Sequence, residues 1–85
     1  MSKIHIGGIP FSADQASFME FVEEKVGKIQ EINWIVNRNT NEFRGFAFVT
    51  FENESDCFQA ILTLNNMEYS GRMLRVSEAS PMKTR

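Results

Sequence analysis

The protein has 85 residues, of which 42% are hydrophobic and eight are Phe, and its formal net charge is −2. One globular domain fits this length and composition, whereas a disordered chain or a membrane span of roughly 18–20 apolar residues does not. The N-terminal residues show no secretory signal, and the single Cys57 cannot form an internal disulfide. We therefore expect a reducing compartment, the nucleus or cytoplasm, with an organelle matrix also open.

The first predicted elements are a short strand and an amphipathic helix. Residues 4–6 alternate as a strand does, and the two glycines that follow end it. Asp14 is the expected N-cap of the helix, with Ser12 as the competing choice. Gly27 is expected to close the helix in the left-handed conformation. The apolar side chains between these ends fall on one stripe: Phe18, Phe21, Val22 and Val26.

The rest of the chain predicts two strands, a helix, a final strand and a tail. A strand over residues 29–36 is followed by a polar turn and by residues 44–51, the strongest strand pattern in the chain. Asn53 can cap a helix over residues 54–64. After it, Ser70-Gly71 turns the chain into a strand over roughly residues 72–77.

The order of these elements is β-α-β-β-α-β. It predicts an α+β, ferredoxin-like sandwich, in which a four-stranded antiparallel sheet carries both helices on one face.

The predicted strand 44–51 has two apolar faces. Period two divides it into one face with Gly45, Ala47, Val49 and Phe51 and another with Arg44, Phe46, Phe48 and Thr50. Burial of both faces is one interpretation. Two helices on one side of the sheet leave the second face open, and grouped exposed aromatic rings usually mark a binding surface.

Residues 44–51 also carry a family resemblance. They are similar to the eight-residue signature of the RNA recognition motif at all seven specified positions. Residues 4–9 resemble the family's six-residue motif on the first strand, and residues 71–76 resemble the usual start of the fourth. The resemblance covers nearly the whole chain, so we expect a domain over residues 2–79 and a polar tail over residues 80–85.

The resemblance implies roles for four side chains. Phe48 would stack on one base, Phe46 would lie against a sugar or between two nucleotides, and Arg44 would pair with a phosphate. His5 occupies the position that typically holds Phe or Tyr. An imidazole can stack on a base, but it offers less area than a benzene ring.

Further contacts are expected on the same face and at its margins, from Lys3, Asn33, Arg38, Arg75 and Ser77. The negative net charge weighs against a nucleic-acid binder, which usually carries a basic surface. The position of the charges matters more than their sum, and most acidic residues fall on the helices. We therefore expect a basic sheet face and an acidic helix face.

The implied function is single-stranded RNA binding in post-transcriptional RNA processing or regulation, by a monomer without a cofactor. Single-stranded DNA is an open alternative partner, because stacking accepts either polymer. A second hypothesis is a protein-interaction module of the same fold that binds a peptide through its acidic helix face. Catalysis of the acylphosphatase kind, which shares this layout, needs an Arg in the loop after the first strand, and residues 7–11 contain none.

Three residues have a structural interpretation. One His and one Cys cannot build a zinc site without several carboxylates, so neither His5 nor Cys57 is expected to bind metal. Cys57 lies on the apolar stripe of the second helix and is expected to be a small packing residue. Trp34 is either a further stacking platform or a core residue, and its period with Ile32 favours the core.

Overall fold

The computed structural model describes residues 3–79, so the predicted polar tail 80–85 lies outside the described residues. The elements follow in the order β1 (Lys3–Gly7), α1 (Gln15–Lys25), β2 (Ile29–Val36), β3 (Phe43–Phe51), α2 (Glu54–Leu64), β4 (Glu68–Tyr69), β5 (Arg72–Met73) and β6 (Arg75–Glu78).

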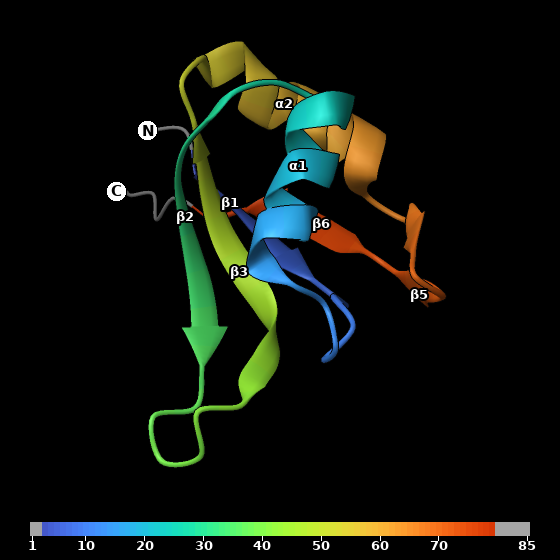
Figure 1. Ribbon diagram of the computed structural model, residues 1–85. Coiled ribbons are helices and arrows are strands. Elements are labelled where there is room, and N and C mark those ends of the chain that lie inside the picture. The colour runs from blue at the N-terminus through green and yellow to red at the C-terminus, as the bar shows by residue number, and fades with distance from the viewer. Residues whose placement is uncertain (1–2, 80–85) are drawn as a thin grey trace.

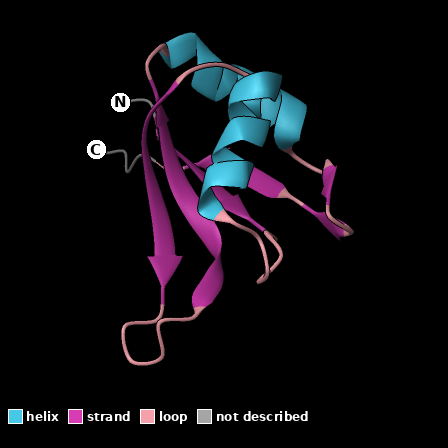
Figure 2. Ribbon diagram, in the orientation of Figure 1, coloured by secondary structure: helices cyan, strands magenta, loops and turns pink. Residues whose placement is uncertain are grey.

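The four longer strands form one antiparallel sheet in the order β2-β3-β1-β6. Both helices lie against the same face of this sheet (Figures 1 and 2). The predicted α+β, ferredoxin-like sandwich is therefore confirmed. The two strands that carry the expected motifs, β1 and β3, are the central strands, so their outward side chains meet in the middle of the sheet.

The core lies between the sheet and the helices. Each strand contributes alternate residues, and each helix contributes residues three or four apart, as the periods of the two structures require. Phe18 and Val22 of α1 are buried there, as are Ala60 and Leu64 of α2. The strands and loops supply the rest of the buried apolar side chains: Ile4, Ile6, Ile9, Ile29, Ala47, Val49, Phe51, Leu74 and Val76.

Helix α1 begins as predicted and ends differently. The Asp14 carboxylate accepts a hydrogen bond from the Ser17 backbone N–H at 3.1 Å, so Asp14 rather than Ser12 is the N-cap. The left-handed conformation expected at Gly27 is wrong, because Gly27 does not have a positive φ. A Cβ atom at Gly27 would instead collide with the Asp56 carboxylate. The connection between α1 and β2 thus approaches the Asp56 side chain of helix α2 closely at Gly27, and a larger residue there would require that side chain to move.

The single strand predicted over residues 72–77 is wrong in part. Ser70 and Gly71, with φ of 51° and 87°, form a tight turn between β4 and β5, the conformation of a two-residue type I′ hairpin. Leu74 then separates β5 from β6. Its side chain is fully buried, and its backbone exchanges hydrogen bonds with Asn66 and Met67 rather than with β1. The chain joins the main sheet only from Arg75 onward.

Within residues 3–79, no helix combines the length and apolar character required to cross a membrane.

Candidate nucleic-acid interface

Three aromatic rings form a cluster on the sheet face opposite the helices. The ring centroid of His5 lies 5.2 Å from that of Phe46 and 5.3 Å from that of Phe48. The two Phe rings are 6.1 Å apart and almost perpendicular. We call these three side chains, His5, Phe46 and Phe48, the aromatic cluster. Each is half-buried, and none belongs to the buried core.

The alternation of side chains along the two central strands determines which face this cluster lies on. Ile4 and Ile6 point into the core, so His5 between them points to the other face. Ala47 and Val49 are fully buried on β3, and Phe48 between them also points outward. The interpretation in which both faces of this strand are buried is therefore wrong for the part of the chain that the structure describes.

Two cations flank the aromatic cluster. The Nζ atom of Lys3 lies 6.0 Å from the ring centroid of Phe48, and the guanidinium carbon of Arg44 lies 6.0 Å from that of Phe46. These distances reach the outer limit of a cation–π contact. Both charges stay close to the rings, and the exposed Arg44 can reach a phosphate beside a stacked base.

A row of side chains crosses the sheet through the cluster. Asn33 of β2 is paired with Phe48, Phe48 with His5, and His5 with Ser77 of β6. Asn33 and Ser77 are exposed at the two ends of the row. Polar groups that can form hydrogen bonds with base edges therefore stand on either side of two adjacent rings.

The remaining predicted residues lie further out. Arg75 is exposed on β6, opposite Gly7, two residues from Ser77 and thus on the same face. Arg38 is exposed in the β2–β3 loop, which extends past the end of the sheet (Figure 1). Glu31 is paired with Thr50 on the same face, where its negative charge reduces the basic character of that face.

Phe11 is an exposed aromatic residue that sequence reasoning did not single out. It lies in the β1–α1 loop and is 70% exposed. The available signal was a Phe directly after Gly7-Gly8-Ile9-Pro10, outside the apolar stripe of the following helix. Neither period two nor period 3.6 applies to a loop, so pattern analysis gave it no position.

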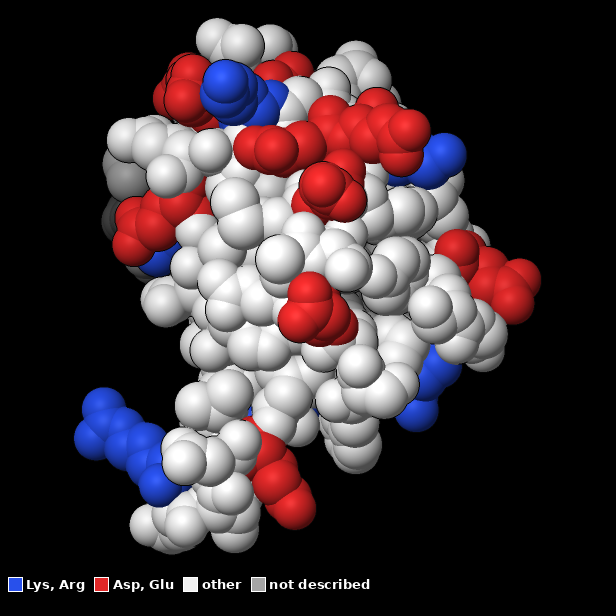
Figure 3. All heavy atoms as spheres, viewed as in Figure 1, with Lys and Arg blue, Asp and Glu red and all other residues white. Residues whose placement is uncertain are grey.

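Acidic side chains gather over the helices on the side of the molecule shown in Figure 3. The red atoms cluster in the upper half of the view, where α1 and α2 lie, and blue atoms extend at the lower left, where the β2–β3 loop lies. The expected acidic helix face is therefore present on the side shown.

Trp34 is partly buried and packs against the core, on the side that its period predicts. Its ring lies 5.8 Å from Phe18 of α1, on the helix side of the sheet, and stacks on Phe43 at 4.0 Å with an angle of 5° between the planes. Trp34 therefore does not extend the open aromatic face.

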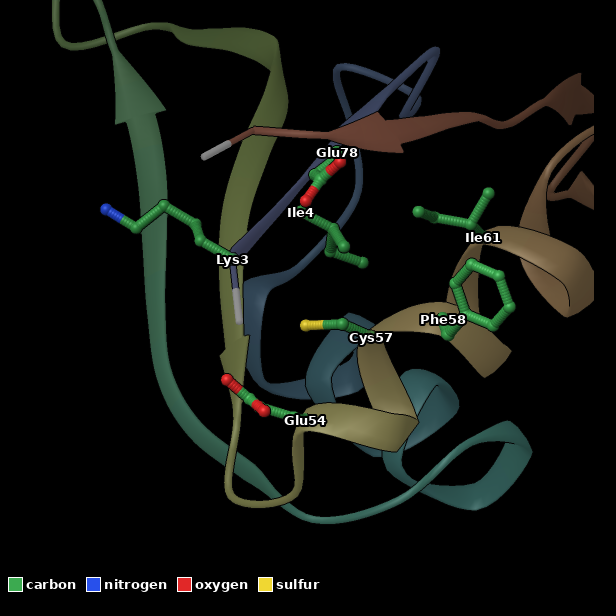
Figure 4. A pocket seen from close by; sticks show the side chains of 7 residues that line it. All are labelled: Lys3, Ile4, Glu54, Cys57, Phe58, Ile61 and Glu78. Carbon is green, nitrogen blue, oxygen red and sulfur yellow. The ribbon is translucent and has the colours of Figure 1, made fainter. Parts of the chain in front are cut away.

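A separate hollow lies on the helix side, between α2 and the ends of β1 and β6 (Figure 4). The Cys57 side chain points from α2 toward β1 in this hollow. Burial raises the pKa of the Cys57 thiol, and the Asp56 carboxylate adds to this rise, whereas a hydrogen bond with the Phe51 backbone opposes it. A thiol kept protonated is a poor nucleophile. In the stretch from residue 3 to residue 79, no group of three or more His, Cys, Asp or Glu side chains could hold a metal ion.

The geometry agrees with the comparison with known proteins. The chain matches the family model described as RNA recognition motif over residues 4–75, and it belongs to this family. The matched range begins within β1, includes all of α1, β2, β3, α2, β4 and β5, and ends at the first residue of β6.

Two relatives come from plants. The chain is 36% identical over 83 residues to 29 kDa ribonucleoprotein A, chloroplastic, of Nicotiana sylvestris, covering 98% of this chain and 30% of the relative. It is 35% identical over 85 residues to RNA-binding protein CP31B, chloroplastic, of Arabidopsis thaliana, covering 99% of this chain and 29% of the relative. The chain thus spans about three tenths of the length of these two relatives.

A solved structure is similar over its full length. The crystal structure of RNA Binding Protein PG1 superimposes with a TM-score of 0.85 and 28% identity, covering 99% of this chain and 100% of that one.

The names of the two plant relatives place those proteins in the chloroplast, which is an organelle rather than the nucleus or cytoplasm expected from the sequence.

Proposed function

We propose that this domain binds single-stranded RNA on the open face of its four-stranded sheet. The observation that carries the proposal is the aromatic cluster, three rings within 5.2–6.1 Å of one another on a face that both helices leave uncovered. Stacking of a base on an aromatic side chain contributes about 1–3 kcal/mol. Two or three such contacts with one or two phosphate contacts correspond to a dissociation constant of about micromolar for a short strand.

Each member of the cluster has a distinct role in this proposal. Phe48 and His5 are directly paired across β3 and β1, so their rings offer platforms to two successive bases. Phe46 lies against a sugar or between the two nucleotides. Arg44 and Lys3, which flank the rings, pair with phosphates.

Single strands are the proposed targets because only unpaired bases can lie flat on a sheet. The outer positions of the row, Asn33 and Ser77, can add hydrogen bonds to base edges, and Arg75 and Arg38 can add backbone contacts at the margins. Stacking alone accepts single-stranded DNA as well. A difference between the two polymers would come from the 2′-hydroxyl of RNA.

We propose post-transcriptional RNA processing or regulation as the process in which this domain acts. The names of the two plant relatives, a ribonucleoprotein and an RNA-binding protein, support this class of process. We take residues 2–79 as the binding domain and residues 80–85 as a polar tail.

The direct test is binding of a mixed-sequence RNA nonamer, followed by fluorescence anisotropy and by chemical-shift mapping. The double variant Phe46→Ala, Phe48→Ala should lose binding while its amide spectrum stays that of a folded domain. Phe58→Ala is the matched control, because Phe58 is 68% exposed on α2, on the helix side. Unchanged binding by the double variant would refute the proposal, and so would its unfolding, which would make those rings structural.

A second candidate function is peptide binding on the helix side. Glu20 and Glu24 of α1 border a shallow groove with Phe21 between them, a surface suited to a peptide with basic and apolar side chains. Shifts centred on α1 when a Lys- and Leu-containing peptide is added would support it. If the aromatic cluster shifts on addition of RNA and α1 does not shift on addition of the peptide, RNA binding is the one of the two activities that is supported.

A further inference from the structure

Helix α2 presents two large apolar side chains to solvent, and they differ in their surroundings. Phe58 and Leu62 are both 68% exposed. Phe58 lines the hollow between α2 and the ends of β1 and β6, whereas Leu62 does not. A single exposed apolar side chain is ordinary, but one that continues an apolar hollow marks a place where a partner can bind.

This hollow, which we call the α2 hollow, has the size of one large side chain. Its volume is about 280 Å³, just below the range of about 300–1,000 Å³ for small-molecule sites. Its apolar lining comes from Ile4 of β1 and from Cys57, Phe58 and Ile61 of α2. Figure 4 shows the Ile61 side chain pointing toward Ile4 across the hollow. The α2 hollow therefore fits one large apolar side chain better than a whole small-molecule ligand.

The charge at the α2 hollow is negative. Lys3 also lines it, but the Lys3 Nζ atom lies 6.0 Å from the ring centroid of Phe48, on the opposite face of the sheet. Figure 4 shows this side chain extending away from the hollow. Glu54 and Glu78 border it as well. Burial is the largest cause of the raised pKa of the Cys57 thiol, and the charges of these two carboxylates add to it. A cation on the partner would complement this charge.

Strand β6 forms one edge of the main sheet and has backbone groups that point away from β1. The Ala79 N–H donates a hydrogen bond to the Lys3 carbonyl at 3.0 Å, so the backbone groups of Val76 and Glu78 alternate to the outer side. The Val76 N–H already donates to the Asn65 side-chain oxygen at 3.0 Å. Within residues 3–79, the Val76 carbonyl and the Glu78 N–H remain for a partner strand.

This edge and the α2 hollow lie side by side, because Glu78 belongs to both. Residues that are directly opposite in neighbouring strands point to the same face of a sheet. A partner residue opposite Glu78 would therefore direct its side chain toward α2, and so would the residues two positions away. An extended peptide can thus pair its main chain with β6 and bury a side chain in the hollow, a known mode of peptide recognition at sheet edges.

We propose that the groove between β6 and α2 binds an extended segment of a protein partner, with a large apolar side chain in the α2 hollow and a Lys or Arg two residues away, beside Glu78. This site goes beyond the proposed RNA binding, and it is separate from the groove on α1. Asn65 limits the site at one end, since it occupies the Val76 N–H.

The test uses a blocked heptapeptide with Phe at its centre, Lys two residues to either side and Thr elsewhere. Isothermal titration calorimetry measures its binding to the full chain. Replacement of the central Phe by Ala should weaken binding about five- to thirtyfold, the range for a residue at the centre of an interface. A peptide with Glu in place of both Lys residues should also bind more weakly than the Lys peptide.

Variants of the protein place the peptide on α2 and β6. Phe58→Ala should weaken binding about five- to thirtyfold. Leu62→Ala is the matched control, since Leu62 is equally exposed on the same helix but does not line the hollow, and it should bind like the wild type. Glu78→Lys should weaken binding of the Lys peptide and strengthen binding of the Glu peptide.

Two further measurements locate the bound peptide. Hydrogen exchange at the Glu78 amide should slow in the complex, because that N–H gains a partner, whereas the Val76 amide is already bonded to Asn65. Alkylation of Cys57, whose side chain points into the hollow, should slow when the peptide fills it.

Three results would overturn the inference. They are no binding of the Phe-centred peptide up to about millimolar concentration, binding that Phe58→Ala leaves unchanged, and peptide-induced shifts confined to α1. Protection of the Glu78 amide that rises with protein concentration in the absence of peptide would assign the edge to a second copy of the chain and would also overturn it. None of these results bears on RNA binding, which the variants of the aromatic cluster test, and loss of RNA binding would leave this inference standing.

Discussion

The two faces of β3 use similar side chains for different purposes. Ala47, Val49 and Phe51 point to the helices and are at most 1% exposed, whereas Phe46 and Phe48 point to the other side and stay half-buried. All but Ala47 are large apolar side chains on the same strand. Only the presence or absence of helices on each side separates a core residue from a binding residue, so hydrophobicity alone cannot assign the role.

The largest effect is expected from a substitution on the buried face of β3. Phe51→Ala should lower the free energy of unfolding by about 3–5 kcal/mol, because it leaves a cavity among fully buried side chains. Urea denaturation measures it. Phe48→Ala, the same substitution on the open face, should cost less than about 1 kcal/mol of stability. It should weaken RNA binding about 5- to 150-fold, the loss of one stacked base. Equal losses of stability in both variants would contradict the comparison.

A smaller effect, on RNA binding, is expected from a larger aromatic ring on the open face. His5→Phe replaces the imidazole with a larger ring at the centre of the row formed by Asn33, Phe48 and Ser77. We expect RNA binding to tighten about two- to fivefold, a fraction of one stacking contact, with little change in stability. Fluorescence anisotropy at a fixed salt concentration measures the change. Weaker binding by this variant would show that the imidazole contributes something other than ring area.

The charges at the margin of the cluster should have a separate signature. Arg44→Gln removes one phosphate contact and should reduce the slope of log affinity against log salt by about 0.7, the value for one contact to a single strand. A titration from low to moderate salt measures the slope. Loss of affinity with an unchanged slope would mean that Arg44 stacks or packs rather than pairs with phosphate.

The smallest effect concerns Cys57 on the helix side. Burial raises the pKa of its thiol, so the folded state favours the protonated form. Its alkylation by iodoacetamide at pH 8 should therefore be slower than that of a free cysteine and should reach the free rate on unfolding. Because the thiol pKa is higher in the folded state than in the unfolded state, the free energy of unfolding falls as the pH rises through the ordinary thiol pKa and above it. Faster alkylation in the folded protein would contradict this.

Much of the fold followed from periodicity. The predicted strand 29–36 and the predicted helix 54–64 have the bounds of β2 and α2, and Trp34 packs against the core on the side that its period with Ile32 indicates. Helix α2 and the part of β2 from Ile32 to Trp34 are regular, so there each side chain's face follows from its number. The aromatic cluster was predictable for the same reason, because His5, Phe46 and Phe48 lie on adjacent regular strands.

The misses have long-range causes. Gly27 lies against the side chain of Asp56, which is far away in the sequence, and does not form a left-handed helix end. Leu74 interrupts the last predicted strand because it fills the core and bonds to the loop at Asn66. The contact between Phe11 and Gly45 joins a loop to a strand. No local pattern specifies such contacts.

The most direct test of the central claim is to detect contacts between the protein and RNA by NMR. In the complex with the mixed-sequence nonamer, nuclear Overhauser effects should connect the ring protons of Phe48 with base protons, and the base protons should shift upfield as they stack. Bound RNA whose contacts fall only on the helices, with the ring protons of Phe46 and Phe48 unchanged, would contradict the account.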